Sequence, residues 1–215
     1  MNPALAWGSL ALSLLMVLAY EVHAHRSARN RPAHQARFAN ARMRVQWVEA
    51  MAAQPGFEIV AVQALRNSLM SATISASTAA LALMASLTLG GTSLASGLGH
   101  LALADHAALG IVLGTLAVLL LFASYVCSAM ATRYYGNATF VMSMPVASAE
   151  RIGLNPVATD YVRRAGLLYG WGLRLFLLVV PLVAGVVHPA ALVPATAVLL
   201  VALWFFDQPA ASSID

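Results

Sequence analysis

The stretch Ala61-Val-Gln-Ala-Leu-Arg-Asn-Ser-Leu-Met-Ser-Ala-Thr-Ile-Ser-Ala-Ser-Thr78 decides how the rest of the sequence is interpreted. It opens a long apolar run, yet at helical spacing one face of it carries amides and hydroxyls, namely those of Gln63, Asn67, Ser71, Ser75 and Thr78. In hydrocarbon such groups need hydrogen-bond partners. We therefore expect this face to contact other helices or a water-filled cavity, and we expect its helix to be central.

Composition indicates a membrane protein. Of 215 residues, 60% are hydrophobic and 9% are charged, whereas soluble domains carry about a quarter charged residues. The apolar residues come in long continuous runs, which is typical of transmembrane helices and not of the alternating pattern of a β-barrel. The predicted fold class is an all-α, polytopic transmembrane helical bundle of about five spans, with residues 1–215 forming a single transmembrane domain.

Turn and cap signals divide the chain. Pro55-Gly56 interrupts the first polar segment, Gly136 is expected to end the third span's helix, and Asn155-Pro156 is expected to begin the next one. Pro181 should kink the fourth span, and His188-Pro189 should form a tight turn. The predicted spans are residues 3–20, 59–89, 106–130, 165–187 and 192–206.

The arginines predict the orientation in the membrane. The chain has twelve arginines and no lysine, and ten of the twelve lie in two segments, 23–56 and 131–164. The connections 90–106 and 188–190 contain none. The positive-inside rule therefore places both basic segments in the cytosol of an inner-membrane protein, with the N-terminus outside and the C-terminus cytosolic. We expect these segments to bind anionic lipid head groups, and nucleic acid is excluded because a folded basic domain with interleaved aromatics is missing.

Four stretches resemble one family. They are the string 61–73 with Trp47 before it, the run Arg133-Tyr-Tyr-Gly-Asn-Ala-Thr-Phe-Val-Met, the segment from Arg164 through Arg174 to Pro181, and Asp207 after the last apolar run. Together they are similar to the domain of unknown function 599 family, over most of the chain from about Arg44 onward. The resemblance implies a multi-pass membrane fold and implies no activity.

Arg174 is the most informative single residue. It lies ten residues beyond Arg164, so it should sit ~15 Å inside the membrane. A central arginine costs at least about 2.5 kcal/mol. One interpretation is a structural cation that pairs with Glu21 or with carbonyls freed at Pro181. The other is an anion site.

The polar stripe also has two interpretations. Its side chains can be hydrogen-bonding and packing groups of a central helix, with Arg66 extended to the cytosolic surface. Alternatively they line a hydrated solute path that the two arginines make anion-selective. That path would comprise Gln63, Arg66, Asn67, Ser71, Ser75, Thr78 and Arg174. Close helix packing is predicted at two small-xxx-small pairs, Gly110 with Gly114 and Gly166 with Gly170.

No pattern predicts catalysis, a metal or a cofactor. None of the six histidines lies in the middle of a predicted span, so the facing pair that a haem would need is missing. A metal site from His100, Asp105, His106 and His188 lacks a tight ligand spacing. No catalytic motif is present, and Cys127 is expected to be a packing residue.

Two hypotheses follow. The first is a non-enzymatic inner-membrane protein, acting as a homo-oligomer, that moves a small anion or polar solute along the second span. The second is an accessory or scaffold subunit that docks a partner membrane protein through the polar stripe.

Overall fold

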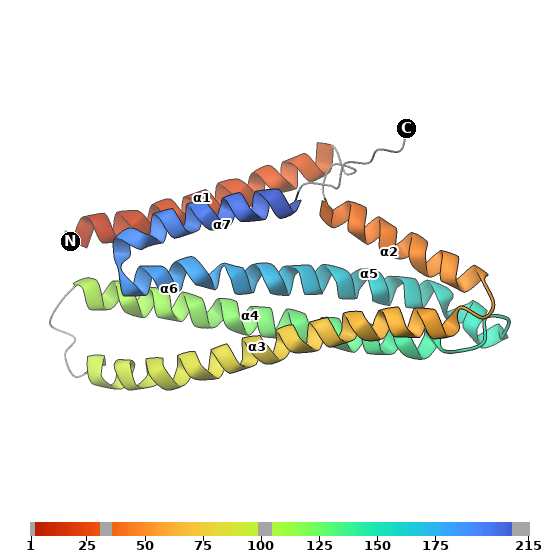
Figure 1. Cartoon of the computed structure of the whole chain (residues 1–215). Helices are drawn as coiled ribbons and strands as arrows, with labels where there is room; N and C mark the ends of the chain where they lie inside the picture. The colour runs from red at the N-terminus through yellow and green to blue at the C-terminus, as the bar shows by residue number, and fades with distance from the viewer. Residues whose placement is uncertain (1–2, 31–35, 99–104, 208–215) are drawn as a thin grey trace.

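The computed structural model describes residues 3–30, 36–98 and 105–207, and within these ranges the chain is helical with no strand (Figure 1). In chain order the elements are α1 (Pro3–Asn30), α2 (Ala36–Ala53), α3 (Glu58–Leu98), α4 (Asp105–Met142), α5 (Ala149–Leu177), α6 (Val179–Val187), the 3₁₀ helix η2 (Pro189–Ala191) and α7 (Leu192–Asp207). Five stretches are long and apolar enough to cross a membrane: Ala4–Ser27, Glu58–Thr88, Ala108–Met142, Ala149–Val187 and Pro189–Asp207. The predicted all-α polytopic bundle is confirmed.

The helices form an elongated bundle. In Figure 1, α1 and α7 lie side by side and run in the same direction, next to the rod made by α5 and α6, with α4 beyond it and α3 outermost. α2 follows α1 in the chain and runs obliquely from the C-terminal end of α1 to the N-terminal part of α5 (Figure 1). α4 and α5 are the best-covered helices, because α4 packs along both α3 and α5.

The expectation that the second span is central is wrong. α3 packs along α4, touches α5 slightly, and lies at the edge of the bundle (Figure 1). Its buried residues are Ala61, Leu65, Ala72 and Ala79. These recur at heptad-like spacing and form an apolar seam on a different face of the helix from Asn67 and Ser71, which are exposed. The seam packs on α4, so the polar stripe is directed away from the other helices.

Two predicted boundaries in the basic segments also differ. α4 does not end at Gly136 but continues to Met142. Gly136 keeps its helical backbone and faces the side chain of Leu69 on α3. α5 does not begin at Asn155-Pro156 but at Ala149, since the Ser148 hydroxyl accepts a hydrogen bond from the Arg151 amide and caps the helix. Pro156 therefore lies inside α5.

Two other predicted breaks are confirmed. Gly56 has φ of +88°, a conformation that glycine adopts without strain, and it turns the chain between α2 and α3. α5 and α6 are separated at Leu178, three residues before Pro181. A proline has no N–H to donate to the carbonyl four residues earlier, so the helix is interrupted there.

Buried residues gather in two clusters, one toward each end of the bundle. The cluster shared by α2, α3, α4 and α5 includes Val48, Leu65, Tyr135, Met142 and Val162. The cluster shared by α1, α4, α6 and α7 includes Leu10, Leu109, Leu113, Leu182 and Leu192. α1 and α7 therefore pack at one end only, and α5 extends well past both of them (Figure 1).

Candidate functional site

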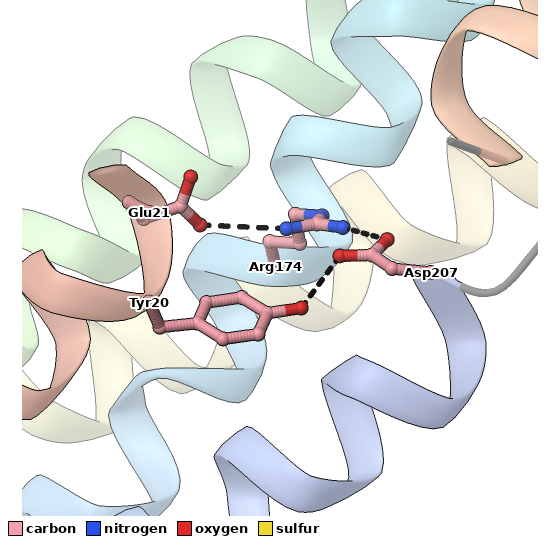
Figure 2. A network of polar contacts seen from close by, with 4 residues as sticks. All are labelled: Tyr20, Glu21, Arg174 and Asp207. Atoms are coloured by element: carbon pink, nitrogen blue, oxygen red, sulfur yellow. Dashed lines mark hydrogen bonds and ion pairs between the residues drawn. The ribbon is translucent and has the colours of Figure 1, made fainter. Parts of the chain in front are cut away.

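Arg174 is the centre of a charged junction of three helices (Figure 2). Its guanidinium, on α5, pairs with the carboxylate of Glu21 on α1 at 3.4 Å and with the carboxylate of Asp207, the last residue of α7. The arginine side chain is 11% exposed and that of Asp207 is 18% exposed. A cation that is buried to this extent has lost most of its hydration, so it needs the neighbouring carboxylates to stabilise its charge.

A tyrosine completes the junction. The Tyr20 hydroxyl donates a hydrogen bond of 2.6 Å to the second carboxylate oxygen of Asp207 (Figure 2). Asp207 therefore forms an ion pair with Arg174 of α5 and accepts a hydrogen bond from Tyr20 of α1. The three helices are tied at one level along the bundle, which is the level at which α7 ends.

The sequence predicted only part of this junction. Glu21 was the acid proposed for Arg174, and the structure pairs them. Asp207 and Tyr20 were not predicted as partners of Arg174. A signal was present: in a five-span bundle the first and last spans run in the same direction, so acids at both of their ends reach a similar depth. Because two carboxylates already hold Arg174, an anion site at its guanidinium is disfavoured.

A cavity of about 500 Å³ adjoins the junction. It lies between the first turns of α2, one face of α5 and the last turns of α7. Most of its wall is aliphatic and aromatic, with Arg174 and Asp207 at one part and Asn40 and Arg44 of α2 at another. This cavity could not be predicted from the sequence, because the cavity forms where three segments that are distant in the sequence meet.

The polar stripe of α3 is on the surface of the chain. Of the predicted stripe, Gln63, Arg66, Asn67, Ser71 and Thr78 are exposed and Ser75 is partly buried. The Ser71 hydroxyl donates to the Asn67 carbonyl at 3.1 Å, and the Thr78 hydroxyl donates to the Ile74 carbonyl at 2.9 Å. Arg174 lies on α5, which barely touches α3. One chain therefore does not bring Arg174 and the stripe into a common path.

At the end of the polar stripe that includes Arg66 there is a shallow hollow of about 300 Å³. It is lined by Gln63, Arg66, Asn67 and Met70. The side chains of the first three form no hydrogen bond or ion pair with the described part of the chain. These groups, unlike the hydroxyls farther along, have unused donors and acceptors.

Of the four glycines predicted for close packing, one faces a neighbouring helix at short range, and two other glycines do so as well. No described atom lies within 4 Å of a Cβ placed on Gly110, Gly114 or Gly170, so within the chain these residues do not bring helices together. Gly166 faces the guanidinium of Arg44. Close contacts also form at Gly172, which meets Ser124 and Ser128 of α4, and at Gly185, which meets Leu113 and Leu192. The Ser124 hydroxyl donates to the Gly172 carbonyl at 2.7 Å.

Arg151, which the sequence counted as a cytosolic surface charge, is buried with 1% exposure. Its guanidinium donates to the Val141 carbonyl at 2.6 Å and to the Asn155 side chain at 2.7 Å. The last carbonyls of a helix have no partner within that helix. Arg151 supplies one at the end of α4 and fixes the turn into α5, so its role is structural.

The comparisons with known proteins agree with the resemblance drawn from sequence. Neither a curated protein nor a solved structure matches the chain significantly. A family model described as "Protein of unknown function, DUF599" matches residues 9–211, which is nearly the whole chain. The chain therefore belongs to the domain of unknown function 599 family, a family whose function is unknown.

Proposed function

We propose that this is a non-enzymatic, multi-pass inner-membrane protein that acts as a homo-oligomer and passes a small anion or polar solute along α3. One observation carries the proposal. Gln63, Arg66 and Asn67 project from the uncovered face of an edge helix, and their side chains have no partner among the residues that the structure describes. In or beside a bilayer, a second protein surface covers such groups at lower cost than lipid does.

A second copy of the same chain suits this face. An amide carries both donors and acceptors, so Asn67 of one copy can bond Asn67 of another, and Gln63 can do likewise. Arg66 lies to one side of the stripe and would remain at the rim, where two copies of it stay solvated. The small side chains of Ser71 and Ser75 allow the backbones to approach closely.

The hydroxyls of the polar stripe would line the solute path and would contribute little to holding the two copies together. The hydroxyl groups of Ser71 and Thr78 already donate to their own helix. Their oxygens still accept, so they can solvate a passing polar solute. The hollow lined by Gln63 and Arg66 would then form the entrance of the solute path, where the positive charge of Arg66 favours anions.

The arginine distribution supports a location and an orientation. Segments 23–56 and 131–164 carry ten of the twelve arginines, which supports a cytosolic position for both and an outside N-terminus with a cytosolic C-terminus. The exposed Arg133, Arg163 and Arg164 are suited to anionic head groups, although Arg163 and Arg164 also pair with Asp160.

An accessory subunit is the second candidate. Gly110, Gly114 and Gly170 have open space where a side chain would be, and small-residue faces of that kind admit a foreign helix. In that case gentle extraction from the membrane should recover a stoichiometric partner of different sequence.

Cysteine cross-linking combined with flux measurement tests the first candidate. In a Cys127→Ser background, Ser71→Cys and Thr78→Cys should form disulfide-linked dimers under mild oxidation. Thr73→Cys is the matched control, because it is exposed on the same helix but on another face. Proteoliposomes should pass chloride, and Arg66→Gln should reduce that flux. Equal cross-linking at Thr73, or chloride flux no greater than in empty liposomes, would exclude the proposal.

A further inference from the structure

We infer that the cavity between α2, α5 and α7 binds an amphiphile with one anionic head group, a phosphate or a carboxylate, and an apolar tail. This inference is independent of the proposed function, because it rests on a different surface of the molecule. It starts from Arg44, which lines the cavity and forms no hydrogen bond or ion pair with the described part of the chain.

The Arg44 guanidinium packs against Gly166 of α5. A Cβ at Gly166 would come within 2.2 Å of the terminal nitrogen and 2.5 Å of the guanidinium carbon. Only glycine leaves that space. Asn40, one helical turn before Arg44 on α2, adds an amide to the same wall.

The donors at this wall indicate an anion. A guanidinium presents its N–H groups as a planar fork that matches the oxygens of a carboxylate or a phosphate. The other guanidinium of the cavity, that of Arg174, already binds Glu21 and Asp207. Arg44 is therefore the available cation, and the head group is assigned to the α2 side, away from the carboxylate of Asp207.

The remaining wall indicates an apolar tail. Leu167, Trp171, Phe176 and Phe206 are among the side chains that surround the space between Arg44 and the junction. The volume of about 500 Å³ falls in the range of small-molecule pockets. Phe206 belongs to the run Trp204-Phe205-Phe206, and such aromatic runs mark the boundary between acyl chains and head groups. The cavity thus lies at a depth where amphiphiles reside.

Two sources have this chemistry: an anionic membrane phospholipid and a free single-chain acid. Native mass spectrometry of the full chain, extracted in a mild non-ionic detergent, distinguishes them by the mass of the bound molecule. The sample is measured as extracted and again after addition of phosphatidylglycerol or oleate. We expect one bound amphiphile per chain, and its mass identifies the source.

Variants locate the molecule. Arg44→Gln should reduce occupancy about tenfold or more, the effect of losing hydrogen bonds to a charged group. Arg42→Gln, an exposed arginine on the same helix, removes the same charge and should leave occupancy unchanged. Gly166→Ala should also reduce occupancy by displacing the Arg44 guanidinium, whereas Gly153→Ala on the same helix meets open space and should not.

Gly166→Ala keeps the test decisive if Arg44→Gln fails to fold, since its methyl meets only the flexible end of a side chain. Bound phospholipid or bound oleate that disappears in both site variants and persists in both controls supports the inference. Equal occupancy in all four variants overturns it. A wild-type chain that carries no amphiphile and takes up neither added probe also overturns it.

Discussion

Arg174 in the last turn of α5 and Asp207 at the end of α7 form an ion pair that joins two helices running in opposite directions. Glu21 reaches the same guanidinium from α1. α1 and α7 are therefore attached to α5 through the same side chain.

Arg174→Met should destabilise the protein by about 3–5 kcal/mol, because it leaves two carboxylates without their cation in a largely buried setting. The triple variant with Glu21→Gln and Asp207→Asn added should recover part of that loss, since no charge is then left alone. Unfolding of detergent-solubilised protein, followed by circular dichroism, measures both. If the triple variant were less stable than the single one, the junction would not be acting through charge.

Tyr20→Phe should lower the free energy of unfolding by about 1.5 kcal/mol, since a hydrogen bond to a carboxylate is lost while the ring remains. A double-mutant cycle with Asp207→Asn should give a coupling energy of similar size. Tyr125→Phe on α4, an exposed tyrosine, is the control and should be close to neutral. Additive effects of Tyr20→Phe and Asp207→Asn would show that the two side chains do not interact.

Gly172→Ala should separate α4 from α5 and cost about 1–3 kcal/mol, because its methyl would lie 2.5 Å from the Ser128 hydroxyl oxygen and 3.3 Å from the Ser124 carbonyl oxygen. Adding Ser128→Gly should restore part of the stability by removing the nearer obstacle. Gly170→Ala, two residues away and facing open space, should be tolerated. Thermal unfolding of the three variants gives the comparison, and similar losses at Gly170 and Gly172 would contradict it.

Arg151→Met should be among the most damaging changes, costing about 3 kcal/mol, because the carbonyl of Val141 and the side chain of Asn155 lose a charged donor. Limited proteolysis should then cut the turn between α4 and α5 much faster than in the native chain. Arg133→Met, an exposed arginine of α4, should change the cleavage rate little. Equal protection of the turn in native and Arg151→Met protein would show that Arg151 is dispensable there.

Much of the fold could be predicted because it depends on local composition. Apolar runs longer than a bilayer needs, the break at Pro55-Gly56 and the interruption before Pro181 all follow from backbone chemistry that neighbouring residues determine. The ends of α4 and α5 could not be predicted in this way. They depend on Arg151, which acts on residues of the preceding helix, and on a serine cap that competes with the Asn-Pro signal seven residues later.

Which face of α3 is buried was predicted wrongly for a physical reason. Amides and hydroxyls inside a span were expected to contact other helices or a water-filled cavity, and therefore to lie on a central helix. The hydroxyls of the stripe satisfy themselves on their own helix, while the alanine and leucine seam at Ala61, Leu65, Ala72 and Ala79 packs on α4. The heptad-like spacing of that seam was the better signal, and it was visible in the sequence.

The candidate sites were predicted less well than the fold. Arg174 was singled out because it lies ten residues beyond Arg164, and Glu21 was the one acid near enough in the predicted topology. The expected position near the middle of a span is not confirmed, since Arg174 is level with Asp207, the last residue of a candidate span. Asp207, Tyr20 and Arg44 reach their positions through contacts between segments more than thirty residues apart in the chain, which no local pattern encodes.

The attachment of α7 to α1 has a consequence for biosynthesis. α1 precedes α7 in the order of synthesis, and among the described helices α1 packs most extensively on α7. Until α7 has been made, Glu21 and Arg174 have no contact with Asp207. The three-helix junction therefore forms late in folding, and α1 completes its packing only after the helices between it and α7 have been synthesised.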